Sequence, residues 1–268
     1  MRNFKKIFTY TLVDLVHHKS FYIMLFISIC FVLLLKGCYK GDYTVNGQHV
    51  SGNAVAWNAS IIAFHIVSAG SLLIALLLSL GVFKRDKDDG SAAYMLSKPI
   101  SRFEYVCGKI AGIWAVSFLF MFVLHVTIVI ITYVNTGGLM PGYLWASLMC
   151  SLNVFFMVAL VSLLSLILPD FAAAFVSLGI VAIGYISDII YKVAQSDLLK
   201  TALGAMQNHV SWWRIAWPKV CALQLSAESL IDQSNYPFMG AVHPAVNVCI
   251  YCGVVLTIFI ARFSREEL

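Results

Sequence analysis

Charged side chains are scarce in this sequence. Asp, Glu, Lys and Arg make up 12% of the 268 residues, whereas soluble domains have about 25%. Hydrophobic residues make up 60%. This small number of charged groups cannot cover the surface of a water-soluble globule. The composition therefore excludes a soluble domain and predicts a membrane protein, most of whose surface faces lipid. No nucleic-acid partner is expected.

The sequence also lacks an ATP-binding motif and a disulfide framework. No Gly-x-x-x-x-Gly-Lys-Ser/Thr occurs, so the chain has no P-loop that could bind ATP. The seven cysteines are odd in number and lie mostly in or beside apolar runs, unlike a secreted disulfide scaffold. Cys249 and Cys252 have the spacing of metal ligands, but without a second pair the favoured interpretation is helix packing. We therefore expect no metal, no cofactor and no catalytic residue in this chain.

Six apolar runs have lengths near the ~20 residues that a membrane-spanning helix needs. They cover about 21–39, 61–83, 110–134, 143–168, 171–191 and 244–261. Pro169 cannot continue a helix and Asp170 is a good N-cap, so the fourth and fifth runs should form a tight helical hairpin. Pro244 is well placed as the first residue of the sixth. The predicted fold class is all-α, with six transmembrane helices in a single domain over 1–268.

Residues 1–20 place apolar side chains at helical spacing on one face, with basic residues elsewhere, which is typical of an amphipathic helix in the membrane interface. A cytosolic extension of the first span is the alternative. Placing the N-terminus inside puts twelve Lys and Arg residues on the inner side and six on the outer side. The positive-inside rule then makes both termini and the 84–109 loop cytoplasmic.

Two segments on the outer side are long. The first, 37–60, is polar and Gly-rich and is predicted to be a loop. The second, 192–243, has apolar spacing for short helices near 198–206 and over 226–231. Its tryptophans suggest contact with the headgroup layer: Trp212, Trp213 and Trp217. The sequence leaves re-entrant, interfacial and periplasmic arrangements of this extracytoplasmic segment open.

The 84–109 loop is ordered rather than merely charged. Asp89 and Gly90 form a turn signal, and Ser91 is the predicted N-cap of a short helix that ends before Pro99. An apolar knob on this helix lies outside any span: Tyr94, Met95 and Leu96. Such a knob packs either on a partner or back on its own bundle, and physical reasoning alone does not separate the two.

A second helix start follows at once. Ser101 and Glu104 have the spacing of a capping box, and the helix that they begin can continue through Lys109 into the third span. A short helix, a proline break and a capped helix thus lead from the cytoplasm into the membrane. This arrangement can transmit the movement of a cytosolic partner into the membrane.

Residues 85–109 resemble the first cytoplasmic loop of type-2 ABC transporter permeases, the six-span membrane subunits of exporter-type ABC systems. That family has a charged start, Gly-Ser/Thr, a Leu, Ser-x-Pro-hydrophobic-Ser-Arg, a Glu, and Gly-Lys before the third span. The matching positions here are Asp89, Gly90, Ser91, Leu96, Ser97, Pro99, Ile100, Ser101, Arg102, Glu104, Gly108 and Lys109. The rest of the chain agrees in layout.

The resemblance implies a coupling helix between spans two and three that docks on a separate ATPase subunit. Its implied contacts are Asp89, Gly90, Ser91, Tyr94, Met95, Leu96, Pro99, Ser101, Arg102 and Glu104. It further implies two ATPase copies holding ATP and Mg²⁺, a second permease subunit, identical or related, and subunit contacts through spans two and five. The chain would be a multi-pass permease in the plasma (inner) membrane of a prokaryote, and not itself an enzyme. The transported substrate is not determined.

Polar residues within the spans support other interpretations. His65 and His125 could ligate haem between the second and third spans, which would make a redox subunit, although neither has a motif around it. A membrane scaffold that recruits partners without transport is a third function. Asn153 and Asp188 are candidates for a transport path, because polar groups at membrane depth are functional candidates.

Overall fold

The computed structural model of this chain describes residues 2–17, 19–35, 37, 43–45, 48–50, 52–194, 217–232 and 242–265. Its helices are α1 (Arg2–His17), α2 (Lys19–Leu35), α3 (Gly52–Ser79), α4 (Val82–Asp88), α5 (Ser91–Leu96), α6 (Arg102–Thr136), α7 (Pro141–Ile167), α8 (Asp170–Ala194), α11 (Val220–Asp232) and α12 (Pro244–Ser264). A short antiparallel hairpin pairs β1 (Tyr43–Val45) with β2 (Gln48–Val50). Apart from this hairpin, the described residues confirm an all-helical protein.

Among the described residues, five helical segments are long and apolar enough to cross a membrane, so the chain is a multi-pass membrane protein. They are Val55–Asp88, Arg102–Thr136, Pro141–Ile167, Asp170–Ile190 and Pro244–Ser264. These five correspond to the second to sixth predicted spans. The predicted first span corresponds to α2, which has 17 residues and follows α1 after a bend of 64°.

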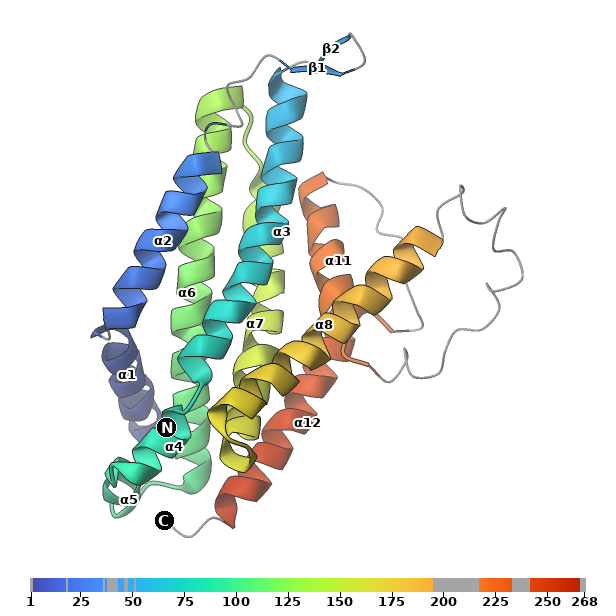
Figure 1. The fold of residues 1–268 in the computed structure, drawn as a ribbon. Coiled ribbons are helices and arrows are strands. Elements are labelled where there is room, and N and C mark those ends of the chain that lie inside the picture. The colour runs from blue at the N-terminus through green and yellow to red at the C-terminus, as the bar shows by residue number, and fades with distance from the viewer. Residues whose placement is uncertain are drawn as a thin grey trace.

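Helices α6 and α7 form the centre of the bundle. The longest helix, α6, packs against α1, α3 and α7, while α7 packs against α3, α11 and α12. In Figure 1, α1, α4 and α5 lie at the same end of the bundle as both termini, and α11 lies in the opposite half. The two halves of the bundle therefore differ, and each carries a cluster of polar contacts.

Two prolines lie at helix boundaries, as the sequence predicts. Helix α7 ends at Ile167 and α8 begins at Asp170, so Pro169 does separate a tight hairpin. Pro244 is the first residue of α12, and the His243 side chain caps this helix by accepting from the Ala245 N–H at 3.2 Å.

The second span is broken where an unbroken helix was predicted. Helix α3 ends at Ser79 and α4 begins at Val82, with Gly81 between them at φ +67°. Glycine adopts this left-handed conformation without the steric cost of a Cβ atom. The helix of the second span is therefore interrupted at Gly81, although Val55–Asp88 as a whole is long and apolar enough to cross a membrane.

The prediction of a loop over 37–60 was also wrong in part. The β1–β2 hairpin lies within it, and α3 already begins at Gly52. Ser60, near the end of this polar extension, bonds to neighbouring helices. Ser60 Oγ lies 2.7 Å from Thr132 Oγ1, and Tyr143 donates to the Ser60 carbonyl at 3.1 Å.

Candidate functional site

The short helix α5 begins one residue earlier than its predicted cap implies. Gly90, not Ser91, is the N-cap, at φ +70°, and Ser91 is the first helical residue. The turn after α4 needs a left-handed residue, which glycine supplies and serine does not. The Ser91 hydroxyl instead donates to the Asp86 carbonyl at 3.2 Å, so it joins α5 to α4.

The predicted capping box at the start of α6 is confirmed. Ser101 Oγ accepts from the Glu104 N–H at 3.1 Å, and Glu104 Oε2 accepts from the Ser101 N–H at 3.3 Å. The neighbouring Arg102 guanidinium donates to the Phe263 carbonyl at 3.1 Å and to the Ser264 carbonyl at 3.0 Å. A cation at the last carbonyls of α12 is favourable. Arg102 therefore links the start of α6 to the end of α12.

Of the predicted apolar knob, only Tyr94 projects from the molecule. Its side chain is 66% exposed, and Lys98 Nζ lies 4.5 Å from the centre of its ring. Met95 and Leu96 pack partly against the core. A second exposed aromatic residue, Phe103, lies in the first turn of α6. Phe103 was not predicted as a contact residue, although an aromatic residue between two charged ones, outside any apolar run, was a signal for it.

A buried ion pair fixes α4 to α6. Asp86 of α4 pairs with Lys109 of α6 and accepts a hydrogen bond from Tyr105, and all three side chains are buried. The Lys109 ammonium also lies 5.9 Å from the centre of the Phe83 ring and 5.8 Å from that of Tyr105. A buried charge is tolerated when it is paired and hydrogen-bonded in this way.

Aromatic rings extend this joint to α12. Phe83 of α4 meets Phe259 edge-on with ring centres 4.9 Å apart, and Tyr105 of α6 stacks on Phe263 at 5.6 Å. We call Phe83, Asp86, Tyr105, Lys109, Phe259 and Phe263 the inner joint. It connects three helices, α4, α6 and α12, at the end of the bundle that carries α5.

Helix α1 packs along the same end of α6 at two glycines. A Cβ atom at Gly108 would lie 3.0 Å from Ile7 Cγ2, and one at Gly112 would lie 2.8 Å from Thr11 Cβ. Their Gly-x-x-x-Gly spacing, a known signal for close helix contact, could have been found in the sequence.

Two polar contacts then attach α1 to the loop. Asp14 pairs with Arg85 of α4 at 3.2 Å, and the Asn3 amide donates to the Pro99 carbonyl at 2.9 Å. The segment from α4 to the start of α6 is thus held by α1 on one side and by the inner joint on the other.

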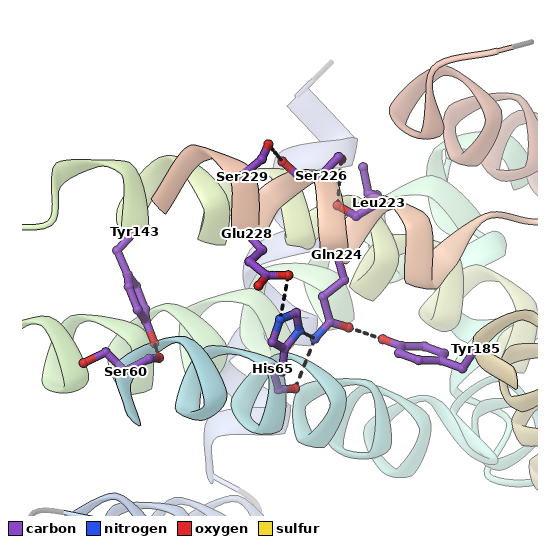
Figure 2. Close-up of polar contacts among 9 residues, drawn as sticks. All are labelled: Ser60, His65, Tyr143, Tyr185, Leu223, Gln224, Ser226, Glu228 and Ser229. Atoms are coloured by element: carbon purple, nitrogen blue, oxygen red, sulfur yellow. Dashed lines mark hydrogen bonds and ion pairs between the residues drawn. The ribbon is translucent and has the colours of Figure 1, made fainter. Parts of the chain in front are cut away.

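A polar network occupies the opposite half of the bundle and joins α3, α8 and α11 (Figure 2). The Gln224 amide group donates to His65 Nδ1 at 2.9 Å and to the His65 carbonyl at 3.1 Å. His65 Nε2 lies 3.1 Å from Glu228 Oε2, and the Tyr185 hydroxyl donates to Gln224 Oε1. We call His65, Tyr185, Gln224 and Glu228 the outer network. None of its members except His65 was singled out from the sequence.

Helix α11, in the described part of the 192–243 segment, is packed against the bundle. It contacts α3, α7, α8 and α12, and it is longer than the predicted 226–231 helix. At Gly142 of α7 a Cβ atom would overlap the Leu230 carbonyl of α11. The buried side chains on α11 are Val220, Cys221, Ala222, Leu223, Gln224, Ser226, Ala227 and Ile231. The predicted 198–206 helix, Trp212 and Trp213 lie outside the described residues.

The two polar residues proposed for a transport path both contact the start of α11. Asp188 Oδ2 accepts from the Ala222 N–H at 3.0 Å, and the Asn153 amide donates to the Val220 carbonyl at 2.9 Å. Trp217, expected in the headgroup layer, is half-buried and donates to the Ile180 carbonyl at 3.0 Å. Asn153 and Asp188 therefore have a structural task, and their role in transport stays a prediction.

The two histidines have different partners. His125 is enclosed, with Nδ1 2.8 Å from Ser147 Oγ, Nε2 3.5 Å from Ser68 Oγ, and its ring stacked on Phe64. His65 instead belongs to the outer network. The arrangement gives the haem alternative no support, because each ring already contacts other side chains. Among the described residues, no group of three or more His, Cys, Asp and Glu side chains could hold a metal ion.

Comparison with known families gives one result. Residues 12–268 match the ABC-2 family transporter protein family. The match covers nearly the whole chain, including the α4–α5 segment, the bundle and α11. No curated protein matches this sequence.

Proposed function

This chain belongs to the ABC-2 family of transporter proteins, and from that premise we propose that it is the permease subunit of an ATP-driven exporter. Members of the family are membrane transport components and are not themselves catalytic. In the proposed complex, two copies of a separate ATPase hold ATP and Mg²⁺. Two permease subunits, identical or related, move a substrate across or out of the membrane.

The proposed topology has six spans, with α2 as the first and α1 in the membrane interface. Both termini and α5 then face the cytoplasm of a prokaryotic cell, with the bundle in its inner membrane. The position of α1, α4 and α5 at the end of the bundle that holds both termini supports this orientation (Figure 1). The excess of Lys and Arg on that side agrees with it.

We assign α5 as the coupling helix, and the inner joint is the observation that carries this assignment. The α4–α5 segment follows directly from α3, yet its buried contacts are with α6 and α12 through Asp86, Lys109 and Phe83. Paired charges and rings in a packed interior leave little freedom for α4 to slide. A push on α5 therefore moves α6 and α12 together with α4.

Tyr94 is the side chain that best fits the ATPase contact. It is the most exposed aromatic residue of the α4–α5 segment, and large aromatic residues dominate the energy of protein interfaces. Replacing Tyr94 with Ala should weaken ATPase binding by about 2 kcal/mol or more, which is about 30-fold in Kd. The measurement is the Kd between the purified permease, held in nanodiscs, and the ATPase that the same genome encodes for it.

Tyr133 provides the matched control for this experiment. Like Tyr94, it is an exposed tyrosine. It belongs to α6, however, and lies near the C-terminal end of that helix, far from Arg102 at its start. Tyr133→Ala should leave ATPase binding unchanged. Equal binding by the Tyr94→Ala variant and the wild type, together with intact transport after deletion of 88–102, would show that α5 is not the coupling helix. ATPase binding without any ATP-dependent redistribution of a substrate would instead support the scaffold function.

A further inference from the structure

An apolar pocket of about 260 Å³ lies between α2, α3 and α6. Helix α6 contacts both of the other helices and lies between them in Figure 1. The apolar walls of the pocket come from Val32 of α2, from Ile66, Val67, Gly70 and Ile74 of α3, and from Leu124 of α6. All of these residues lie within the first three predicted spans, so the pocket is at the depth of the lipid hydrocarbon. None of them belongs to the inner joint or to the outer network.

Gly70 keeps part of this space open. A Cβ atom at Gly70 would meet no described atom within 4 Å, whereas protein interiors are normally packed with few voids larger than a water molecule. Side chains that border an empty space lose their contacts on that side, and the cost grows with the volume of the space. The pocket is therefore more stable when a molecule fills it than when it is empty.

The polar groups of the lining do not favour water in this pocket. They are two serine hydroxyls, and both already have partners: Ser71 donates to the Ser68 carbonyl at 2.6 Å, and Ser28 is engaged as well. Among the described lining residues none carries a charge. A buried water needs two to four polar partners, and an apolar cavity of about 150 Å³ stays dry and binds a small hydrocarbon instead. The chemistry of the lining therefore selects a hydrocarbon.

The pocket opens at the outer surface of the bundle. Its lining residue Ile66 is 42% exposed, whereas Val67 is 5% and Leu124 is 4% exposed. Ile66 thus lies at the mouth, and Val67 and Leu124 form the inner wall. Both α2 and α3 carry further exposed apolar side chains in the same spans: Ile29, Leu33, Ile62 and Leu73. At this depth in a membrane, the apolar molecules that such a mouth meets are the acyl chains of bilayer lipids.

We propose that this pocket is a binding site for one acyl chain of a bilayer lipid. The chain enters past Ile66, occupies the space beside Gly70 and contacts Val67 and Leu124 at the inner wall. Lipid tails are as apolar as the lining, so van der Waals packing rather than the hydrophobic effect makes the chain prefer the pocket to the surrounding bilayer. The site goes beyond the proposed exporter function and does not depend on ATPase docking.

The test uses phosphatidylcholine that carries a photoreactive diazirine in one acyl chain, in nanodiscs that contain the full-length permease. Illumination releases N₂ from the diazirine, the resulting carbene inserts into a neighbouring bond, and mass spectrometry locates the adducts. Val67 and Leu124 should carry adducts although both are buried. Lipid that only surrounds the protein would label exposed residues such as Ile250 and Ile258 of α12, but not these two. This comparison needs no mutation, so a folding defect cannot obscure it.

The Gly70→Leu variant then locates the site by filling the pocket. It should lower the adducts at Val67 and Leu124 by about threefold or more, which is the scale of packing differences in lipid. Gly253→Leu is the matched control and should leave these adducts unchanged, because a Cβ atom at this glycine of α12 also meets no described atom within 4 Å.

Three results would each overturn the proposal. The first is a wild-type protein without adducts at Val67 and Leu124, and the second is an unchanged level of these adducts in Gly70→Leu. The third is crosslinking to another protein, as the main product in native membranes, from p-benzoylphenylalanine placed at Ile66, because a protein would then cover the mouth of the pocket.

Discussion

At the scale of single residues, the same ion pair chemistry occurs in two very different settings. Asp86 and Lys109 are paired inside the inner joint and are both buried. Asp14 and Arg85 are paired at the surface, with both side chains 45% exposed. Removing one partner of a buried pair leaves an uncompensated charge away from water, whereas solvent stabilises each member of an exposed pair.

The Lys109→Met variant should therefore lose about 3–5 kcal/mol of unfolding free energy, because Asp86 is left buried and unpaired. Reversible unfolding in mixed micelles measures this loss. The double variant Asp86→Asn/Lys109→Met should recover part of it, since no charge remains buried. A single-variant loss below about 1 kcal/mol would mean that water reaches the inner joint.

The Asp14→Asn variant is the counterpart at the surface. It should change the unfolding free energy by about 1 kcal/mol or less, and the change should shrink as salt is added. The same unfolding measurement at low and high ionic strength checks it. A loss comparable to that of Lys109→Met would indicate that α1 shields this pair from solvent more fully than its exposure suggests.

At the scale of helices, two elements are held by close backbone approach. Helix α1 meets α6 at Gly108 and Gly112, and α11 meets α7 at Gly142. Such contacts need glycine because any side chain would occupy the space of the partner helix. By contrast, a Cβ atom at Gly253 of α12 would meet nothing within 4 Å. These positions separate glycines that are required by packing from glycines that are not.

Gly112→Ala should destabilise the protein by about 1–3 kcal/mol, because its Cβ atom would overlap Thr11 of α1. Gly253→Ala should instead be neutral or stabilising by up to about 1 kcal/mol, since alanine favours the helix. Unfolding free energies measure both effects. Trypsin cleavage after Lys5 and Lys6 should accelerate only in Gly112→Ala, as α1 leaves α6. Unchanged cleavage there would contradict the packing of α1 by these glycines.

The helices also show what the sequence can predict. The Ser101–Glu104 capping box and Pro244 at the start of α12 follow from neighbours three or four residues away, so their patterns were sufficient. The break at Gly81 and the cap at Gly90 depend on a left-handed turn that the tertiary arrangement selects. The burial of helix α11 was not predicted, because it depends on partners such as His65, 159 residues away from Gln224.

The candidate sites divide in the same way. The α4–α5 segment was found from its own motif, because capping and turn signals are local. The inner joint and the outer network were not, because Asp86, Lys109, His65 and Glu228 acquire their roles only from partners on other helices. The fold buries Asp86 and Lys109, although both come from the charged 84–109 loop.

At the scale of the whole molecule, polar groups gather at two levels of an otherwise apolar bundle. The level near α5 joins α1, α4, α6 and α12, and the level near α11 joins α3, α8 and α11 (Figure 1). Helix α6 connects them, because it runs without a break from the Ser101 cap to Thr136. In the proposed exporter, ATPase movement enters at the first level, and α6 carries it toward the second.

The central claim is that a separate ATPase docks on α5, and photo-crosslinking from position 94 tests it most directly. A p-benzoylphenylalanine placed at Tyr94 is activated in membranes of the native host, and the adducts are identified by mass spectrometry; the same group at Tyr133 is the control. The account predicts that an ATPase with a P-loop is the main adduct at position 94 and is absent at 133. Adducts at position 94 with the permease itself or with a protein lacking a P-loop would contradict it.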